Sequence, residues 1–242
     1  MRTDLITAKL IYGLLEEHAP QVAAAWAIEF SEQVASVASQ VKKIVPGSDL
    51  VALAQHVLAK TVIESWDLKN VALIAAGTPT PLSPKPDQIL YFTDANEEAV
   101  ADAQKAGYKA IKVDATDSDD LKKLTTASTA VMTGLCHFLP DELVKQVFNG
   151  LATGGFDRAI LTQLNSQTGQ EGVEQYSKLG VNLFLRDKDE FGSLIPADWE
   201  ITHHLPLREA LNNHSEFGLI FDNLTVMLDV YEISKNGKNG SQ

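Results

Sequence analysis

Three short apolar runs decide the fold of this chain: VALIAA at residues 71–76, QILYFT at 88–93 and AIKV at 110–113. Each run has the length of a β-strand, and each stops at a glycine or an aspartate, residues that commonly end strands. A continuous apolar run is typical of a strand that is covered on both faces. The three runs therefore predict three strands of an α/β protein, with the run at 71–76 in the middle of the sheet.

The segment between the second and third runs, residues 96–106, has the composition of a helix. Asn96 is suited to the N-cap, Glu97 and Glu98 lie in the expected first turn, and Gly107 follows the expected last turn. A strand, a helix and a strand at this spacing predict a right-handed crossover between parallel strands.

Gly77, Asp94 and Asp114 directly follow the three runs. Ligands of open parallel sheets bind outside the carboxyl ends of the strands, where these residues are expected to meet. A carboxylate after the second strand can accept hydrogen bonds from both hydroxyls of a ribose, and one after the third can meet an adenine amino group. Gly77 allows the backbone to approach a ligand closely.

This arrangement resembles that of the class I S-adenosylmethionine-dependent methyltransferases. Asp94 matches the acidic residue after the second strand of that family, and Asp114-Ala115 matches the pair after its third strand. The family usually carries Gly-x-Gly-x-Gly after the first strand, whereas this chain has Ala76-Gly77-Thr78-Pro79-Thr80. That sequence resembles the shorter Ala-Gly-x-x-Thr turn of the leucine carboxyl methyltransferase type.

A second passage, TAVMTGLCHFLPDE at residues 129–142, resembles the fourth strand of the same family and the loop that follows it. The resemblance implies S-adenosylmethionine as the cofactor. The residues that it places at the cofactor are Ala76, Gly77, Thr78, Asp94, Ala95, Asp114, Ala115, Thr133, Gly134 and Leu135.

The connection after the first run departs from the usual dinucleotide fold. Residues 78–86 contain four prolines, at positions 79, 81, 84 and 86. Proline removes a backbone donor and breaks helices, so the long helix that normally follows the first strand is either absent or reduced to a turn.

Residues 157–164, 199–205 and 224–231 are predicted to be the fifth to seventh strands. The last two are joined without a helical crossover, which predicts an antiparallel pair at one edge. Helices are predicted after Pro140 (with Leu143, Val147 and Leu151 inward), at 117–124, at 169–179 and at 187–194. The expected fold is a Rossmann-like sheet of seven strands, mostly parallel, with an antiparallel last strand.

The N-terminal part, residues 1–66, is predicted to form a cap of three helices before the methyltransferase domain at 67–233, and residues 234–242 to be a disordered tail. An apolar stripe through Trp26 and Phe30 repeats every three to four residues. It serves either as a substrate cover or as the interface of a homodimer, and the sequence leaves both open.

Composition narrows the class of protein. The chain has 242 residues, is 45% hydrophobic and 21% charged, and has a net charge of −12, which disfavours nucleic acid and anionic membranes as partners. No apolar run approaches a membrane span, and no signal peptide is apparent. The single cysteine, Cys136, fits a reducing compartment, so a cytoplasmic location is expected.

Few residues suggest direct catalysis. His137 is considered as a general base near the methyl donor, and Cys136 as a small apolar thiol. His203 and His204 are neighbours on a strand and point to opposite faces, so they do not form a shared metal site. A site made of His204, His214 and residue 216 is also considered, and no metal is predicted.

These observations favour a methyltransferase that uses S-adenosylmethionine and acts on a small molecule. No catalytic residue is assigned, because an activated sulfonium donor requires mainly alignment and a dry pocket. Two alternatives stay open: a non-catalytic ligand-binding or scaffolding protein with the same fold, and a nicotinamide-dependent oxidoreductase, since Asp94 also suits that ribose.

Overall fold

The computed structural model describes residues 56, 59–60, 62–64, 66–79, 83–166, 173–174, 177, 180–206 and 228–236. Residues 1–55 lie outside this range, and with them most of the expected helical cap, its apolar stripe and any dimer surface on it. Those expectations remain predictions.

The strands of the described chain are β1 (Val71–Leu73), β2 (Tyr91–Asp94), β3 (Ala110–Lys112), β4 (Thr129–Met132), β5 (Arg158–Leu164), β6 (Trp199–Pro206) and β7 (Leu228–Lys235). The helices are α4 (Glu97–Lys105), α5 (Ser118–Leu121), α6 (Asp141–Thr153) and α8 (Lys188–Gly192), with a 3₁₀ turn, η1, at Cys136–Phe138. None of the helices in the described part of the chain has the length and apolar character that a bilayer span requires.

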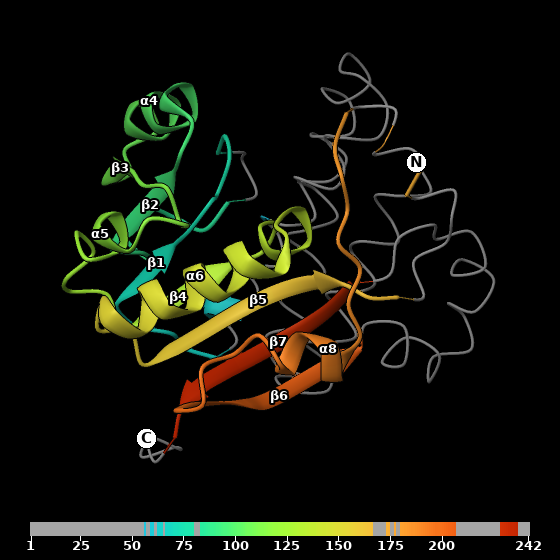
Figure 1. The fold of residues 1–242 in the computed structure, drawn as a ribbon. Helices are drawn as coiled ribbons and strands as arrows, with labels where there is room; N and C mark the ends of the chain where they lie inside the picture. The colour runs from blue at the N-terminus through green and yellow to red at the C-terminus, as the bar shows by residue number, and fades with distance from the viewer. Residues whose placement is uncertain are drawn as a thin grey trace, which may run out of the picture.

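The described strands form one seven-stranded sheet in the order β3-β2-β1-β4-β5-β7-β6 (Figure 1). Strands β1 to β5 run parallel to one another, while β7 is antiparallel to both β5 and β6. The predicted seven strands, the interior position of β1 and the antiparallel last strand are all confirmed. The order reverses between β1 and β4, which puts the topological switch point beside β1.

Several predicted strand boundaries were wrong, each for a local reason. β1 ends at Leu73 instead of Ala76 because Ala75 adopts a left-handed conformation with φ of 52° and turns the chain out of the sheet. β2 begins at Tyr91 instead of Gln88, because Gln88 belongs to a turn in which its backbone amide donates to the Lys85 carbonyl at 2.9 Å. β7 continues through Lys235, into the segment expected to be a disordered tail. Residues 224–227 and 237–242 lie outside the described residues.

The helices begin where the sequence predicts. The Asn96 side chain caps α4 by accepting from the Glu98 amide at 2.9 Å, and the Asp117 side chain caps α5 through the Asp119 amide at 2.8 Å. In α6, Val147 and Leu151 are fully buried as predicted, but Val144 is buried in place of the half-buried Leu143. The predicted helix at 169–179 lies mostly outside the described residues.

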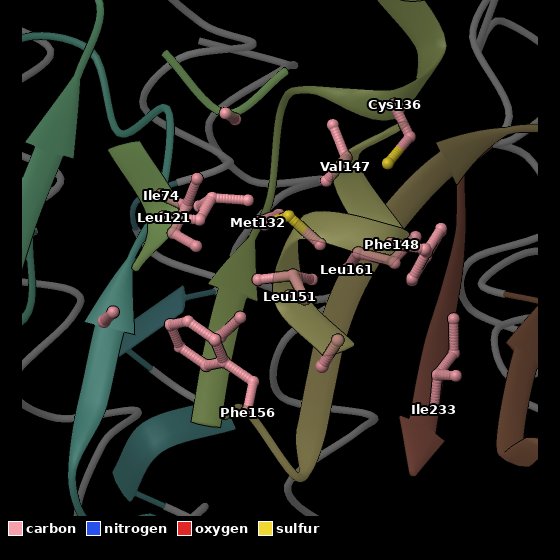
Figure 2. Packing of buried hydrophobic residues seen from close by; sticks show 14 of the residues in the cluster. Ile74, Leu121, Met132, Cys136, Val147, Phe148, Leu151, Phe156, Leu161 and Ile233 are labelled. Carbon is pink, nitrogen blue, oxygen red and sulfur yellow. The ribbon is translucent and has the colours of Figure 1, made fainter. Parts of the chain in front are cut away.

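Two apolar layers cover the two faces of the sheet. One layer joins α6 and α8 to the sheet: the rings of Phe148 and Phe191 are 6.0 Å apart, and both pack in a cluster with Leu161 of β5. Figure 2 shows Phe148 and Leu151 of α6 beside Leu161 and Met132 of the sheet. The other layer contains Val100 and Ala103 of α4, with side chains of β1, β2 and β4. The strands β1, β2, β4 and β5 are therefore buried on both faces, whereas the edge strand β3 is exposed at Lys112.

Candidate functional site

The parallel strands all end at the same edge of the sheet, and the predicted site residues lie there. Gly77 follows β1, Asp94 ends β2, Asp114 follows β3, and Thr133 to Leu135 follow β4. The structure thus brings together the four separate stretches that the sequence singled out, because β3, β2, β1 and β4 follow one another in the sheet.

The turn after β1 is built from two left-handed residues. Ala75 has a φ of 52° and Gly77 has a φ of 68°. A non-glycine residue in this region costs roughly 1 kcal/mol or more, so Ala75 holds strain that the surrounding structure must offset. The Ala76 amide donates to the Thr93 carbonyl at 2.9 Å, which fixes the turn against β2.

Gly77 faces open space. A Cβ atom built on this residue would meet no described atom within 4 Å. Within the described residues, the glycine is therefore required by its positive φ and not by a crowding neighbour, which leaves its backbone open to a ligand.

The Asp94 carboxylate holds the turns after two strands in place. Its Oδ2 accepts from the Gly77 amide at 2.7 Å, and its Oδ1 accepts from the Asn96 amide at 2.8 Å. Asp94 is therefore not the cap of α4, a role that belongs to Asn96. A carboxylate has about four lone-pair positions, and the described residues donate to about two of those of the half-buried Asp94.

Asp114 is exposed and organises the loop after β3. Its Oδ1 accepts from the amide and the hydroxyl of Thr116 at 2.9 and 2.7 Å. Within the described part of the chain, Oδ2 has no hydrogen-bond donor. The neighbouring Ala115 is buried in the core, whereas Ala95 after Asp94 is exposed.

The loop after β4 is tied down by buried polar contacts. The Thr133 carbonyl accepts from the Thr162 hydroxyl of β5 at 2.6 Å. Arg186, only 3% exposed, donates to the carbonyls of Cys136 and Leu139 at 3.0 and 2.6 Å. The same guanidinium bonds the Asp141 carboxylate at 2.9 Å through Nε. No sequence signal had marked Arg186, since its partners are mostly backbone atoms that only the fold brings together.

His137 is unsuited to act as a general base. It is 1% exposed, and burial lowers the pKa of its imidazole to about 4. The charge of Arg186 lowers this pKa further, whereas the nearby Thr162 backbone raises it. Neither ring nitrogen makes a well-formed hydrogen bond within the described residues. Burial also raises the pKa of the Cys136 thiol to about 12, which agrees with the predicted apolar role of this cysteine.

A buried pair anchors the proline-rich connection after β1. The Ser83 hydroxyl lies 3.0 Å from Nδ1 of His56, and burial lowers the pKa of this histidine to about 4. The described residues of the connection form turns and no helix, as the prolines predict. His56 belongs to the segment before β1, so this contact joins that segment to the connection after β1.

A second polar cluster lies at the same edge of the sheet, between β5, β7 and β6. The Asp229 carboxylate accepts from Nε2 of His204 at 2.9 Å, from the Asn165 amide at 2.8 Å and from the Tyr231 hydroxyl at 3.2 Å. Sequence reasoning considered His204 only as a metal ligand and missed Asp229. The available signal was the polar aspartate in the apolar run of β7.

The described residues contain no group of side chains able to hold a metal ion. His203 packs edge-on against Trp66, while His204 stacks on Tyr231, so the two histidines do point to opposite faces. His214 and Glu216 lie outside the described residues.

No family model matches this sequence, and no curated protein does so.

Solved structures do match the fold. Magnesium protoporphyrin IX methyltransferase from Synechocystis PCC 6803, with bound SAH, is 14% identical, with a TM-score of 0.53 over 79% of this chain and 89% of that one. A putative methyltransferase from Thermobifida fusca YX gives 13% identity and a TM-score of 0.53, over 84% and 87%. A SAM-dependent methyltransferase from Anabaena variabilis ATCC 29413 is 14% identical, with a TM-score of 0.51 over 74% of this chain and 85% of that one. The chain therefore has the fold of class I S-adenosylmethionine-dependent methyltransferases.

Proposed function

We propose that this protein is an S-adenosylmethionine-dependent methyltransferase that acts on a small molecule. The observation that carries the proposal is the Gly77–Asp94 contact. It places an open backbone turn and a carboxylate with spare acceptor positions side by side, at the carboxyl ends of β1 and β2. A ribose diol that donates to this carboxylate would lie beside the open turn.

The residues present fit such a cofactor. Asp94 is proposed to accept from the ribose hydroxyls, and Asp114, through its Oδ2, from the adenine amino group. Open space at Gly77 leaves room for the cofactor beside the backbone. The other residues proposed to line the cofactor are Ala76, Thr78, Ala95, Ala115, Thr133, Gly134 and Leu135.

Bound S-adenosylmethionine supplies a methyl group that is already activated by its sulfonium. The protein then needs to align the acceptor in line with that methyl and to exclude water. The buried contacts of Arg186 and Thr162 support this role, because they hold the loop after β4 rigidly against β5. The named solved neighbours are methyltransferases, which is consistent with the proposal. A cytoplasmic location is part of the same proposal.

Isothermal titration of the full chain with S-adenosylmethionine, its demethylated product and NAD tests the cofactor. We expect the first two to bind and NAD not to bind. Binding of NAD alone would favour an oxidoreductase. Absence of binding for all three ligands at millimolar concentration would favour a non-catalytic protein with this fold.

A matched pair of glycine variants sharpens the test. Gly77 and Gly155 both have positive φ, 68° and 89°, and at neither would an added Cβ meet a described atom within 4 Å. Gly155 lies before β5, at the opposite edge of the sheet from Gly77. Gly77→Ala and Gly155→Ala should each lower stability by about 1–2 kcal/mol, from backbone strain alone. Only Gly77→Ala should weaken the titrated affinity for S-adenosylmethionine, and equal effects of the two would contradict the proposed site.

A further inference from the structure

The buried guanidinium of Arg186 has an acceptor for each of its nitrogen atoms. Its Nε donates to the Asp141 carboxylate at 2.9 Å, and its Nη2 lies 2.8 Å from the same oxygen and donates to the Leu139 carbonyl at 2.6 Å. Its Nη1 donates to the Cys136 carbonyl at 3.0 Å and has two longer contacts with oxygen atoms, at 3.3 and 3.4 Å. The planar side chain is therefore fixed in one orientation.

The nearest acceptors of Arg186 belong to the loop after β4 and to the start of α6, far from Arg186 in the sequence. Arg186 itself is attached to the end of β5, because its backbone amide donates to the Leu164 carbonyl at 3.1 Å. The Phe184 amide donates to the His137 carbonyl at 2.8 Å, so the residues just before Arg186 also contact the loop. Arg186 therefore fastens the loop after β4 to the end of β5.

The beginning of the same loop is held by a second buried side chain of the β5 strand. The Thr162 hydroxyl donates to the Thr133 carbonyl at 2.6 Å, and Thr162 is 1% exposed. The residues 133–135, which are proposed to line the cofactor, thus lie between this contact and the Cys136 carbonyl that Arg186 binds. Two buried side chains therefore set the backbone of a proposed cofactor loop from both of its ends.

The order of the strands indicates which half of the cofactor this loop serves. In the proposed site, Asp114 after β3 accepts from the adenine amino group, and Asp94 at the end of β2 accepts from the ribose. β1 and then β4 follow in the same direction across the sheet, and neighbouring strands are about 4.8 Å apart. The substituent on the ribose 5′ carbon, which carries the sulfonium and the amino acid, is therefore expected to extend past β1 toward the loop after β4.

We propose that Arg186 and Thr162 are positioning residues, which hold the loop after β4 in the conformation that receives the sulfonium and amino-acid half of S-adenosylmethionine. This inference rests on the proposed methyltransferase function. Arg186 acts through the carbonyls of Cys136 and Leu139, and Thr162 acts through the carbonyl of Thr133. Lysine keeps the charge of Arg186 but has a single nitrogen, so it does not reproduce the planar fork that reaches both carbonyls and the Asp141 carboxylate.

The first test compares Arg186→Lys with the matched control Arg158→Lys. Arg158 is the first residue of β5, at the opposite edge of the sheet, and its Nε lies 2.6 Å from Oε1 of Glu232. The full chain is titrated with S-adenosylmethionine, S-adenosylhomocysteine and adenosine, at a temperature where thermal melts show each variant to be folded. Arg186→Lys should weaken the first two ligands by about tenfold or more and adenosine by less than about threefold. Arg158→Lys should change no affinity by more than about threefold.

The second test uses Thr162 and decides the proposal even if Arg186→Lys does not fold. Thr162→Val removes the hydroxyl that binds the Thr133 carbonyl and keeps the shape of the side chain, whereas Thr162→Ser keeps the hydroxyl. Thr162→Val should weaken S-adenosylhomocysteine by about tenfold or more and adenosine by less than about threefold. Thr162→Ser should restore the affinity to within about threefold of wild type, and equal affinities in the two variants would overturn the proposal.

The other outcomes separate the proposal from the proposed function. If Arg186→Lys weakens adenosine as much as the other ligands, or weakens none of them, or if Arg158→Lys gives the same pattern, Arg186 only stabilises the fold and the proposal is overturned. A loss for S-adenosylmethionine without one for S-adenosylhomocysteine also overturns it, because these ligands differ in the charge on sulfur. A wild type that binds S-adenosylhomocysteine but not adenosine at millimolar concentration contradicts the division of the site into halves. Only a wild type that binds neither S-adenosyl compound refutes the proposed function, and the positioning role then falls with it.

Discussion

Asp94→Ala separates the cofactor role of this residue from its structural role. The change removes the acceptors of two backbone amides, Gly77 at 2.7 Å and Asn96 at 2.8 Å. Each such bond contributes about 0.5–1.5 kcal/mol, and water can replace part of it at a half-buried site. We therefore expect the free energy of unfolding to fall by about 1–3 kcal/mol, which corresponds to a Tm lower by roughly 5 °C for a chain of this size.

The effect on ligand binding should be larger. Asp94 is proposed to accept from the ribose hydroxyls, and charge-assisted bonds of this kind contribute about 1.5–3 kcal/mol each. S-adenosylmethionine affinity should fall by about tenfold to a thousandfold. Displacement of the Gly77 turn, which also loses its partner, acts in the same direction.

Asp187→Ala provides the matched control. The Asp187 side chain accepts from the Glu190 amide at 2.8 Å as the N-cap of α8, and within the described residues it makes no hydrogen bond to a proposed cofactor residue. It should lower stability by about 0.5–2 kcal/mol and leave S-adenosylmethionine affinity unchanged. Thermal melts with and without ligand, together with titration calorimetry, measure both quantities. An Asp94→Ala protein that melts lower but keeps the full ligand-induced rise in Tm would refute the reasoning.

Three further predictions concern the core. Gly150→Ala places a Cβ 2.6 Å from Cδ1 of the fully buried Leu121. Although alanine favours a helix more than glycine does, this clash should lower the free energy of unfolding, measured by denaturant titration, by about 1–2 kcal/mol. Adding Leu121→Val to this variant should restore part of the loss. Cys136 in the native protein should resist iodoacetamide at pH 8 and react only on unfolding, because its pKa is about 12; rapid native labelling would contradict this. His137 and His56 have folded pKa values of about 4, below the unfolded value of about 6.5, so stability should be full above pH 6.5 and decline toward pH 4. His137→Phe should reduce the loss of stability between pH 6.5 and pH 4 by up to about 3 kcal/mol. If the pH dependence of Tm were unchanged in this variant, protonation of His137 would not be the cause of the loss.

Much of the sheet was predictable because its signal is local. The apolar runs near 71, 88 and 110 identified β1, β2 and β3, and the helical signature at 96–106 identified α4, which connects the parallel strands β2 and β3. Caps such as Asn96 and Asp117 act within a few residues of themselves, so sequence locates them well. The exact strand ends were less predictable, because β1 stops where Ala75 takes a strained conformation that only the fold enforces.

The sequence by itself also indicated which residues lie at or shortly after the carboxyl ends of the first three strands, and hence that Gly77, Asp94 and Asp114 lie at one edge. Only the tertiary structure decided how those residues are used. The carboxylate of Asp94 binds the Gly77 amide 17 positions earlier, and Asp229 meets Asn165 from 64 positions earlier. Arg186 binds backbone carbonyls of the loop after β4, and burial removes His137 from the list of possible bases. Contacts between distant segments and the loss of water around a side chain arise when the chain packs, so no local pattern of residues encodes them.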